Sequence, residues 1–83
     1  MSEWIGEIRF RPEVAEKLWD KHELTPEDVR QAVACGAHDR YSWDNDPDYG
    51  LRLILEGSDT RGRLRAYLRP IDREDGLWEC LTA

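Results

Sequence analysis

The chain has 83 residues, of which 36% are charged and 40% hydrophobic, and its net charge is −6. This length supports one small domain over residues 1–83, with four tryptophans to help fill its core. The net acidity argues against general affinity for nucleic acid. A membrane span is excluded by the lack of a long apolar run, and the N-terminus does not resemble a signal peptide. We therefore expect a cytoplasmic protein without a membrane partner.

Two features of the sequence bear on metal binding. Cys35 and Cys80 show none of the paired cysteine or histidine spacings of a zinc site, so we expect reduced thiols rather than a disulfide. The run Asp44, Asp46 and Asp48 has the spacing that opens a calcium-binding loop, but the closing glutamate of such a loop is missing. The sequence therefore predicts a solvated acidic loop here, with no metal site and no cofactor.

The N-terminal part of the chain predicts a strand followed by a helix. Residues 4–10 alternate in hydropathy, which places Trp4, Ile8 and Phe10 on one face of a strand. Pro12 suits the first turn of a helix, and we expect a short amphipathic helix over residues 11–21. Its apolar residues form two pairs at i, i+4 spacing, Val14 with Leu18 and Ala15 with Trp19.

The start of the second helix has the strongest local signal in the sequence. Thr25 is an N-cap residue, Pro26 takes the first helical position, and the acidic residues after it complement the helix dipole. The helix is expected to run to about Cys35 and to stop at Gly36. Its buried stripe consists of Val29, Ala32 and Val33.

The remaining segments predict strands. Residues 38–43 indicate a short strand or an extended loop, and residues 77–82 indicate a last alternating strand. Together with a hairpin between them, the order is one strand, a two-helix hairpin, and then an antiparallel sheet of three to four strands. The fold class is therefore α+β, with the helices packed on one face of the sheet.

A β-hairpin is predicted over residues 49–70, because apolar residues alternate on both sides of a polar loop. One face of the hairpin carries six apolar side chains, namely Leu51, Leu53, Leu55, Leu64, Ala66 and Leu68. If that face lines the core, the opposite face displays four arginines and a tyrosine. These are Arg52, Arg63, Arg65, Arg69 and Tyr67.

The arginines stand out because the rest of the chain is acidic. Residues 51–70 carry five arginines against two acidic residues, whereas residues 1–48 carry six basic and twelve acidic residues. In one interpretation the arginines lie flat on an exposed sheet face, where cross-strand partners such as Glu56 offset their charge. In the other, they are forked donors to phosphates, with Tyr67 as a stacking platform.

Lys21 and His22 end the first predicted helix. Cations are favoured at a helix C-terminus, so both residues have a structural explanation. His22 is also a candidate general acid or base, because imidazole titrates near neutral pH.

Five short motifs follow one another along most of the chain. They are Lys21-His22, the helix start Thr25-Pro26-Glu27-Asp28-Val29, the strand 52–57, the turn Gly62-Arg63-Leu64, and the strand end Leu81-Thr82-Ala83. In this order and spacing they resemble the BrnT-like branch of the RelE/ParE toxin superfamily.

The resemblance implies a microbial-ribonuclease-like fold and the toxin of a bacterial toxin–antitoxin system. Such toxins cut messenger RNA, often at the ribosome, and are neutralised by an antitoxin protein. In this cleavage the 2′-hydroxyl attacks the neighbouring phosphate, which requires an acid, a base and cationic stabilisation. The implied catalytic residues are His22, Lys21 and Arg63, and the implied RNA-binding residues are Arg52, Arg63, Arg65, Tyr67 and Arg69.

The chain departs from these toxins in two respects. Its net charge is −6, whereas they are usually basic, and it stops at Ala83, where they continue into an arginine-rich segment. The sequence therefore favours an RNA-targeting, endoribonuclease-like toxin or a degenerate relative, with an antitoxin and RNA or the ribosome as partners. The alternative is a non-catalytic interaction module that binds an acidic partner through the arginine-bearing face of the hairpin.

Overall fold

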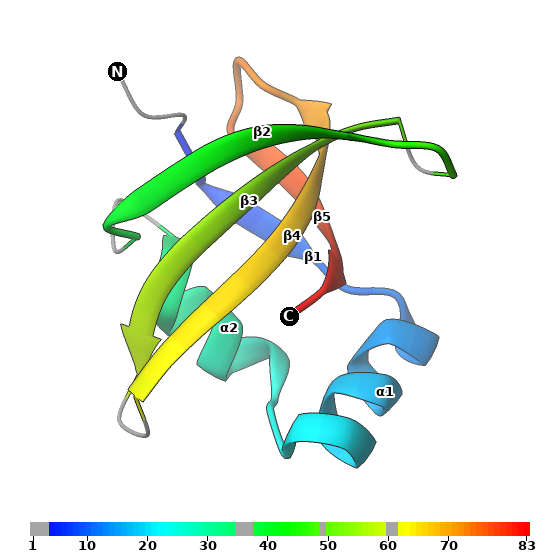
Figure 1. The fold of residues 1–83 in the computed structure, drawn as a ribbon, viewed down its shortest axis with the longest axis vertical. Helices are drawn as coiled ribbons and strands as arrows, with labels where there is room; N and C mark the ends of the chain where they lie inside the picture. The colour runs from blue at the N-terminus through cyan, green and yellow to red at the C-terminus, as the bar shows by residue number, and fades with distance from the viewer. Residues whose placement is uncertain (1–3, 35–37, 49, 60–61) are drawn as a thin grey trace.

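Five strands and two helices make up the fold in the computed structural model, which describes residues 4–34, 38–48, 50–59 and 62–83 (Figure 1). Their order along the chain is β1(Glu7–Arg9), α1(Pro12–His22), α2(Pro26–Val33), β2(Arg40–Asp46), β3(Gly50–Asp59), β4(Gly62–Asp72) and β5(Leu77–Thr82). The strands form one sheet in the order β1-β5-β4-β3-β2. The predicted α+β class with two helices is confirmed, but the sheet has five strands instead of three to four.

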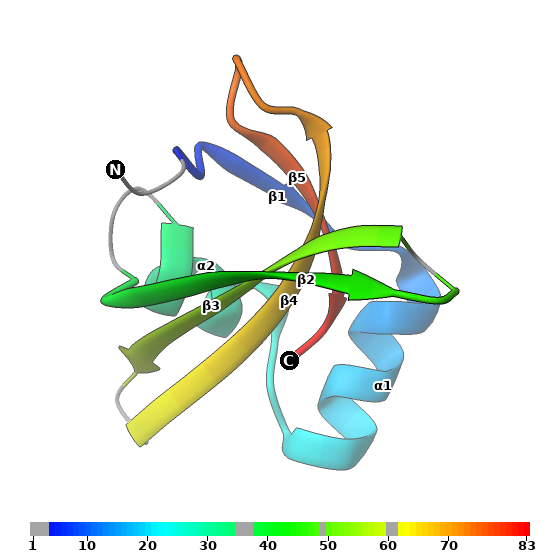
Figure 2. The same ribbon diagram turned by 45° about the horizontal axis from the view of Figure 1, so that its top comes forward.

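Both helices pack on the same face of the sheet, where they cover the core (Figures 1 and 2). Helix α2 lies against β3 and β4, and α1 lies against β5. The apolar stripe predicted for α2 is buried, as are most of the apolar residues predicted for the hairpin. The buried cluster is Ile5, Ile8, Leu18, Val29, Ala32, Val33, Leu53, Leu55, Leu64, Ala66, Leu68, Trp78 and Cys80.

Strand β1 runs parallel to β5, with Ile8 opposite Trp78. The sheet is therefore mixed, and the prediction of a purely antiparallel sheet was wrong for this pair. Strand β1 is also shorter than residues 4–10, because Trp4 lies outside it and is 54% exposed while Ile5 is buried. The alternation within a short strand carries no information about the direction of a partner some seventy residues away.

Strand β2 extends through two of the aspartates that were predicted to lie in a loop. Asp44 stands directly opposite Arg52 on β3, and the Arg52 Nε donates a 2.7 Å hydrogen bond to the Asp44 carboxylate. A cross-strand pair of opposite charge stabilises a sheet, which offsets the poor strand propensity of aspartate. The loop prediction was therefore wrong for residues 44–46.

The hairpin of β3 and β4 has the predicted alternation, with one exception. Glu56 on β3 is paired with Arg65 on β4, so their side chains share the face opposite the core. Leu51 was expected in the core but is 45% exposed. Pairing between β3 and β4 begins at Leu53. Leu51 therefore has a paired strand only on its β2 side, where it stands opposite Asn45.

Local end signals close both helices on either side of the short connection at residues 23–25. At the start of α2, the Asp28 backbone N–H donates to the Thr25 hydroxyl and the Thr25 N–H donates to the Asp28 carboxylate, which is a complete capping box. At the end of α1, Glu23 adopts a left-handed conformation with φ of 53°. Of the apolar residues paired along the predicted amphipathic helix, Leu18 is buried and Trp19 is 57% exposed.

Within the described ranges, no helix is long and apolar enough to cross a membrane. Cys80 is a free, fully buried thiol, while Cys35 and the predicted stop at Gly36 lie outside the described residues. Burial raises the pKa of Cys80 to about 12, because a thiolate would lose its hydration in the core.

This burial predicts that Cys80 is unreactive in the folded protein. In a Cys35→Ser variant at pH 8, alkylation of Cys80 should be more than about 1000-fold slower than that of a free cysteine, because thiolate is scarce. The rate can be followed by mass spectrometry in native buffer, with the same variant in guanidinium chloride as the unfolded control. Equal rates in the two conditions would contradict the burial of this thiol.

Candidate functional site

The face of the sheet opposite the helices carries all the arginines that the sequence placed on the hairpin. We call this the arginine face, and it comprises Arg52 on β3 with Arg63, Arg65, Tyr67 and Arg69 on β4. The hairpin register brings Ile54 opposite Tyr67 at its centre. Alternation along two paired strands is therefore sufficient to gather these side chains.

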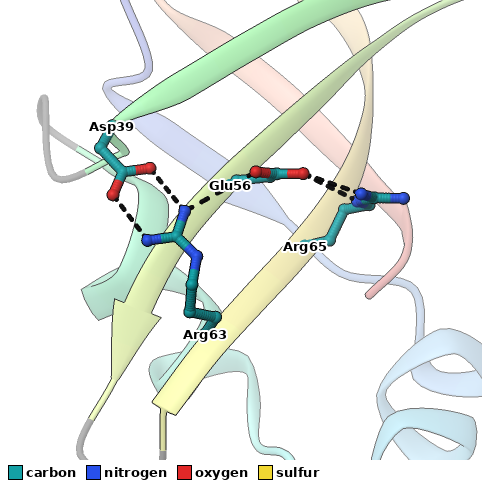
Figure 3. A network of polar contacts seen from close by, with 4 residues as sticks. All are labelled: Asp39, Glu56, Arg63 and Arg65. Atoms are coloured by element: carbon teal, nitrogen blue, oxygen red, sulfur yellow. Dashed lines mark hydrogen bonds and ion pairs between the residues drawn. The ribbon is translucent and has the colours of Figure 1, made fainter.

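Carboxylates on the same face hold two of these arginines (Figure 3). Arg63 makes two 2.8 Å hydrogen bonds to Asp39, one from each terminal nitrogen. Arg65 donates to Glu56 at 2.8 Å from Nη2 and 3.2 Å from Nε, and Arg63 lies 3.6 Å from the other Glu56 oxygen. The four side chains thus form a network of alternating charge across β4, β3 and the residue preceding β2.

The other two arginines have partners at the opposite end of the sheet. Arg52 contacts Asp44 at 2.7 Å and Asp46 at 3.4 Å, and its guanidinium lies 4.8 Å from the centre of the Tyr67 ring. Arg69 lies 2.9 Å from Glu79 on β5. Both residues therefore act as cross-strand partners within the sheet, which agrees with the structural interpretation of the arginine face.

The ion pairs keep these groups charged over a wide range of pH. A hydrogen bond from Arg63 lowers the pKa of Asp39, and hydrogen bonds to Asp39 and Asp44 raise the pKa values of Arg63 and Arg52 respectively. The pKa of Arg65 is raised by Tyr67 and then by Glu56. These groups are exposed to solvent, which screens their charges, so each pair adds little to stability.

An open pocket of about 570 Å³ lies at one edge of the arginine face, between β4, the connection of the two helices and the end of β5. In Figure 1 the label of the C-terminus stands in this region, between β4 and α1. The pocket is lined by His22, Leu24, Arg63, Leu64, Arg65, Tyr67 and Ala83. In the part of the chain that the structure describes, no aspartate or glutamate side chain lines it.

The pocket brings together four of the seven residues that the sequence singled out, His22, Arg63, Arg65 and Tyr67. His22 reaches it from the last turn of α1, where it also complements the helix dipole. Lys21 lies in the same turn but is not part of the lining. Arg52 stacks behind Tyr67, and Arg69 is held by Glu79 away from the pocket.

Sequence reasoning missed most of the carboxylates that hold the arginines. Glu56 was recognised as a cross-strand partner, but Asp39, Asp44, Asp46 and Glu79 were not. The sequence held a signal for one of them. A strand extended from residues 38–43 to residue 46 brings Asp44 opposite Arg52, and such a pair of opposite charges favours strand pairing. Among the described residues, no group of three histidine, cysteine, aspartate or glutamate side chains is arranged to hold a metal ion.

Comparisons with protein-family models, curated proteins and solved structures found no match to this chain. A functional proposal for the protein therefore rests on the chemistry of the pocket and of the arginine face, together with the motifs of the sequence.

Proposed function

We propose that this protein is a RelE/ParE-like toxin domain, or a degenerate relative of one, that binds RNA at the pocket beside β4. One observation carries the proposal. In a chain of net charge −6, the pocket is lined by two arginines, a histidine and a tyrosine and, in the described residues, by no acidic side chain. Such a lining suits an anion with an attached aromatic base.

The residues of the pocket suit the requirements of RNA cleavage by the 2′-hydroxyl. Arg63 and Arg65 supply the cationic donors that a pentacovalent phosphate needs. His22 is the side chain in the lining best suited to move a proton to or from the reacting oxygens. The ring of Tyr67, backed by Arg52, offers a surface on which a base can stack.

Binding of a phosphate requires an exchange of partners, because Arg63 and Arg65 already contact carboxylates. Their side chains are 56% and 57% exposed, so each guanidinium can turn toward the pocket at a small cost. The phosphate oxygens then replace those of Asp39 and Glu56. The antitoxin partner and the cytoplasmic location expected from the sequence belong to this proposal.

Substitutions within and outside the pocket test the proposal. Purified protein is incubated with messenger RNA, with and without ribosomes, and both cleavage and RNA affinity are measured. His22→Ala should slow cleavage at least about 100-fold and change affinity little, since it removes proton transfer. Arg63→Ala should weaken RNA binding about tenfold, since it removes a phosphate contact.

Arg69→Ala is the matched control, since Arg69 lies on the same strand and face but outside the pocket. It should leave both quantities within about twofold of the wild type. If the wild-type protein neither binds nor cuts RNA, the proposal is lost. Equal effects of Arg63→Ala and Arg69→Ala would move the binding site from the pocket to the whole arginine face.

A second candidate is a non-catalytic module that binds an acidic protein. It is favoured by the contact between Arg63 and Asp39, in which the guanidinium donates two hydrogen bonds to one carboxylate. An arginine on this face therefore binds a carboxylate in good geometry. A wild-type protein that binds RNA weakly, cuts none, and retains an acidic protein partner would fit this candidate.

A further inference from the structure

The strands at the two borders of the sheet, β1 and β2, differ in what they offer to another strand. Strand β1 has three residues, and the guanidinium of Arg30 already donates a 3.2 Å hydrogen bond to the carbonyl of Ile8. Strand β2 has seven residues and lies between α2 and β3 in the sequence. In the described residues it pairs with β3 alone, and both ribbon views show it at the border of the sheet (Figures 1 and 2).

The outer side of β2 presents backbone groups that can pair. An edge strand points the N–H and C=O of every second residue away from its neighbour, and proteins often block such an edge with proline or lysine. Strand β2 contains neither residue. The helices pack elsewhere, α2 against β3 and β4 and α1 against β5. Seven residues at about 3.4 Å each give an edge of about 24 Å, which is long enough for a whole strand to pair.

The charges of β2 make the strand complementary to itself. Arg40 lies at one end and Asp46 at the other. Arg40 stands opposite Glu56, and Asp46 contacts Arg52, so both side chains lie on the arginine face. When a second copy runs antiparallel with Trp43 at the centre, Arg40 of each copy stands opposite Asp46 of the other. Two pairs of opposite charge then stabilise the strand pairing.

Other antiparallel registers fit less well. A shift of one residue would turn the second copy over, so that its helices would lie on the side of the arginine face. A shift of two residues pairs only five of the seven residues of β2. In one direction this shift also sets Asp44 opposite Asp44 of the other copy, where like charges repel. The register centred on Trp43 is therefore the one that pairs the whole strand.

We propose that β2 pairs with β2 of a second copy of this chain, antiparallel and centred on Trp43. The two five-strand sheets join into one sheet of ten strands. The twofold axis is perpendicular to the sheet, so both arginine faces lie on one side and the helices of both copies on the other. The interface is small, and we expect a weak and reversible dimer.

The aspartate at this interface can accept a further donor. Asp46 accepts a 2.8 Å hydrogen bond from the Asp48 amide and lies 3.4 Å from Arg52. A carboxylate has about four acceptor positions, so room remains for Arg40 of the second copy. The pairing uses neither the pocket nor RNA, and the inference therefore stands or fails independently of the proposed function.

The first test needs no substitution. Sedimentation of the wild-type protein is measured from about 1 μM to about 1 mM, and a dimer should appear towards the upper end. Amide hydrogen exchange should slow in residues 40–46 as the concentration rises and stay unchanged in residues 7–9 of β1. A monomer throughout this range, or a dimer without slower exchange in residues 40–46, would overturn the inference.

Charge reversal tests the register. Arg40→Glu and Asp46→Lys each set like charges opposite one another at both ends of the interface, so each should raise the dissociation constant of the dimer at least about tenfold. A mixture of the two variants restores two pairs of opposite charge. It should form a heterodimer with an affinity within about threefold of the wild type, and native mass spectrometry separates this species by mass.

Lys17→Glu is the matched control for Arg40→Glu. It makes the same change in charge at an exposed position of α1 and should leave the dissociation constant within about twofold. Circular dichroism checks that each variant is folded. Equal weakening by Lys17→Glu and Arg40→Glu would show a general effect of charge and overturn the inference. Folded variants that form no heterodimer when mixed would likewise overturn it.

Discussion

Replacing Gly57 with alanine should destabilise the fold by about 3 kcal/mol or more, a large fraction of the stability of a domain this small. Gly57 is buried on β3 directly beneath α2, and a Cβ atom there would overlap the carbonyl group of Ala32. The obstacle is backbone inside a helix, so a side-chain rotation cannot relieve it. Helix α2 would have to move away from the sheet and uncover Val29 and Val33.

The measurement is the free energy of unfolding from urea titration, followed by tryptophan fluorescence and far-UV circular dichroism. Ser58→Ala is the matched control, because Ser58 is the next residue on β3 and is exposed. It should change stability by less than about 0.5 kcal/mol. A Gly57→Ala variant as stable as this control would show that α2 and β3 do not approach each other at this point.

Glu56→Gln should raise RNA affinity, by roughly threefold to tenfold. Glu56 lies between Arg65 and Arg63 and competes with any phosphate for both guanidinium groups. Glutamine keeps the size of the side chain and removes its negative charge, so the two arginines are freer to turn toward the pocket. The slope of log affinity against log salt concentration should also become steeper.

Glu79→Gln provides a control with the same change in net charge. Glu79 contacts Arg69 and Arg11 at the far end of the arginine face, and none of the three residues lines the pocket. Its removal should change RNA affinity by less than about twofold. If the two glutamine variants gain affinity equally, the gain comes from overall charge, and Glu56 does not compete locally.

Local sequence patterns predicted the parts of the fold that local physics decides. The capping box at Thr25 depends on residues three apart, and the alternation in the hairpin depends on neighbours along one strand. The parallel pairing of β1 with β5 joins residues some seventy positions apart, and nothing in either segment specifies it. The extension of β2 depends on a charge pair with β3, which outweighs the loop-like composition of the aspartates.

The sequence predicted which residues form the candidate site, but it did not predict the pocket in which they meet. Alternation was enough to put Arg63, Arg65 and Tyr67 on one face, and the helix end was enough to mark His22. Their convergence on one pocket depends on how the helix connection packs beside β4, which no spacing in the sequence shows. The ion pair of Arg63 with Asp39 likewise joins β4 to the residue preceding β2, across β3. The catalytic and RNA-binding roles of these residues stay predictions.

The pairing of β1 with β5 also bears on how the protein folds. In the described sheet the only neighbour of β1 is β5, about seventy residues further along the chain. The indole of Trp78 donates to the carbonyl of Trp4, and the Gly6 and Glu7 amides both donate to the carbonyl of Gly76, so these contacts join the same two distant segments. Contacts between such distant parts of a chain slow folding. We therefore expect β1 to join the sheet later than the hairpin of β3 and β4 forms, because the hairpin closes a much shorter loop.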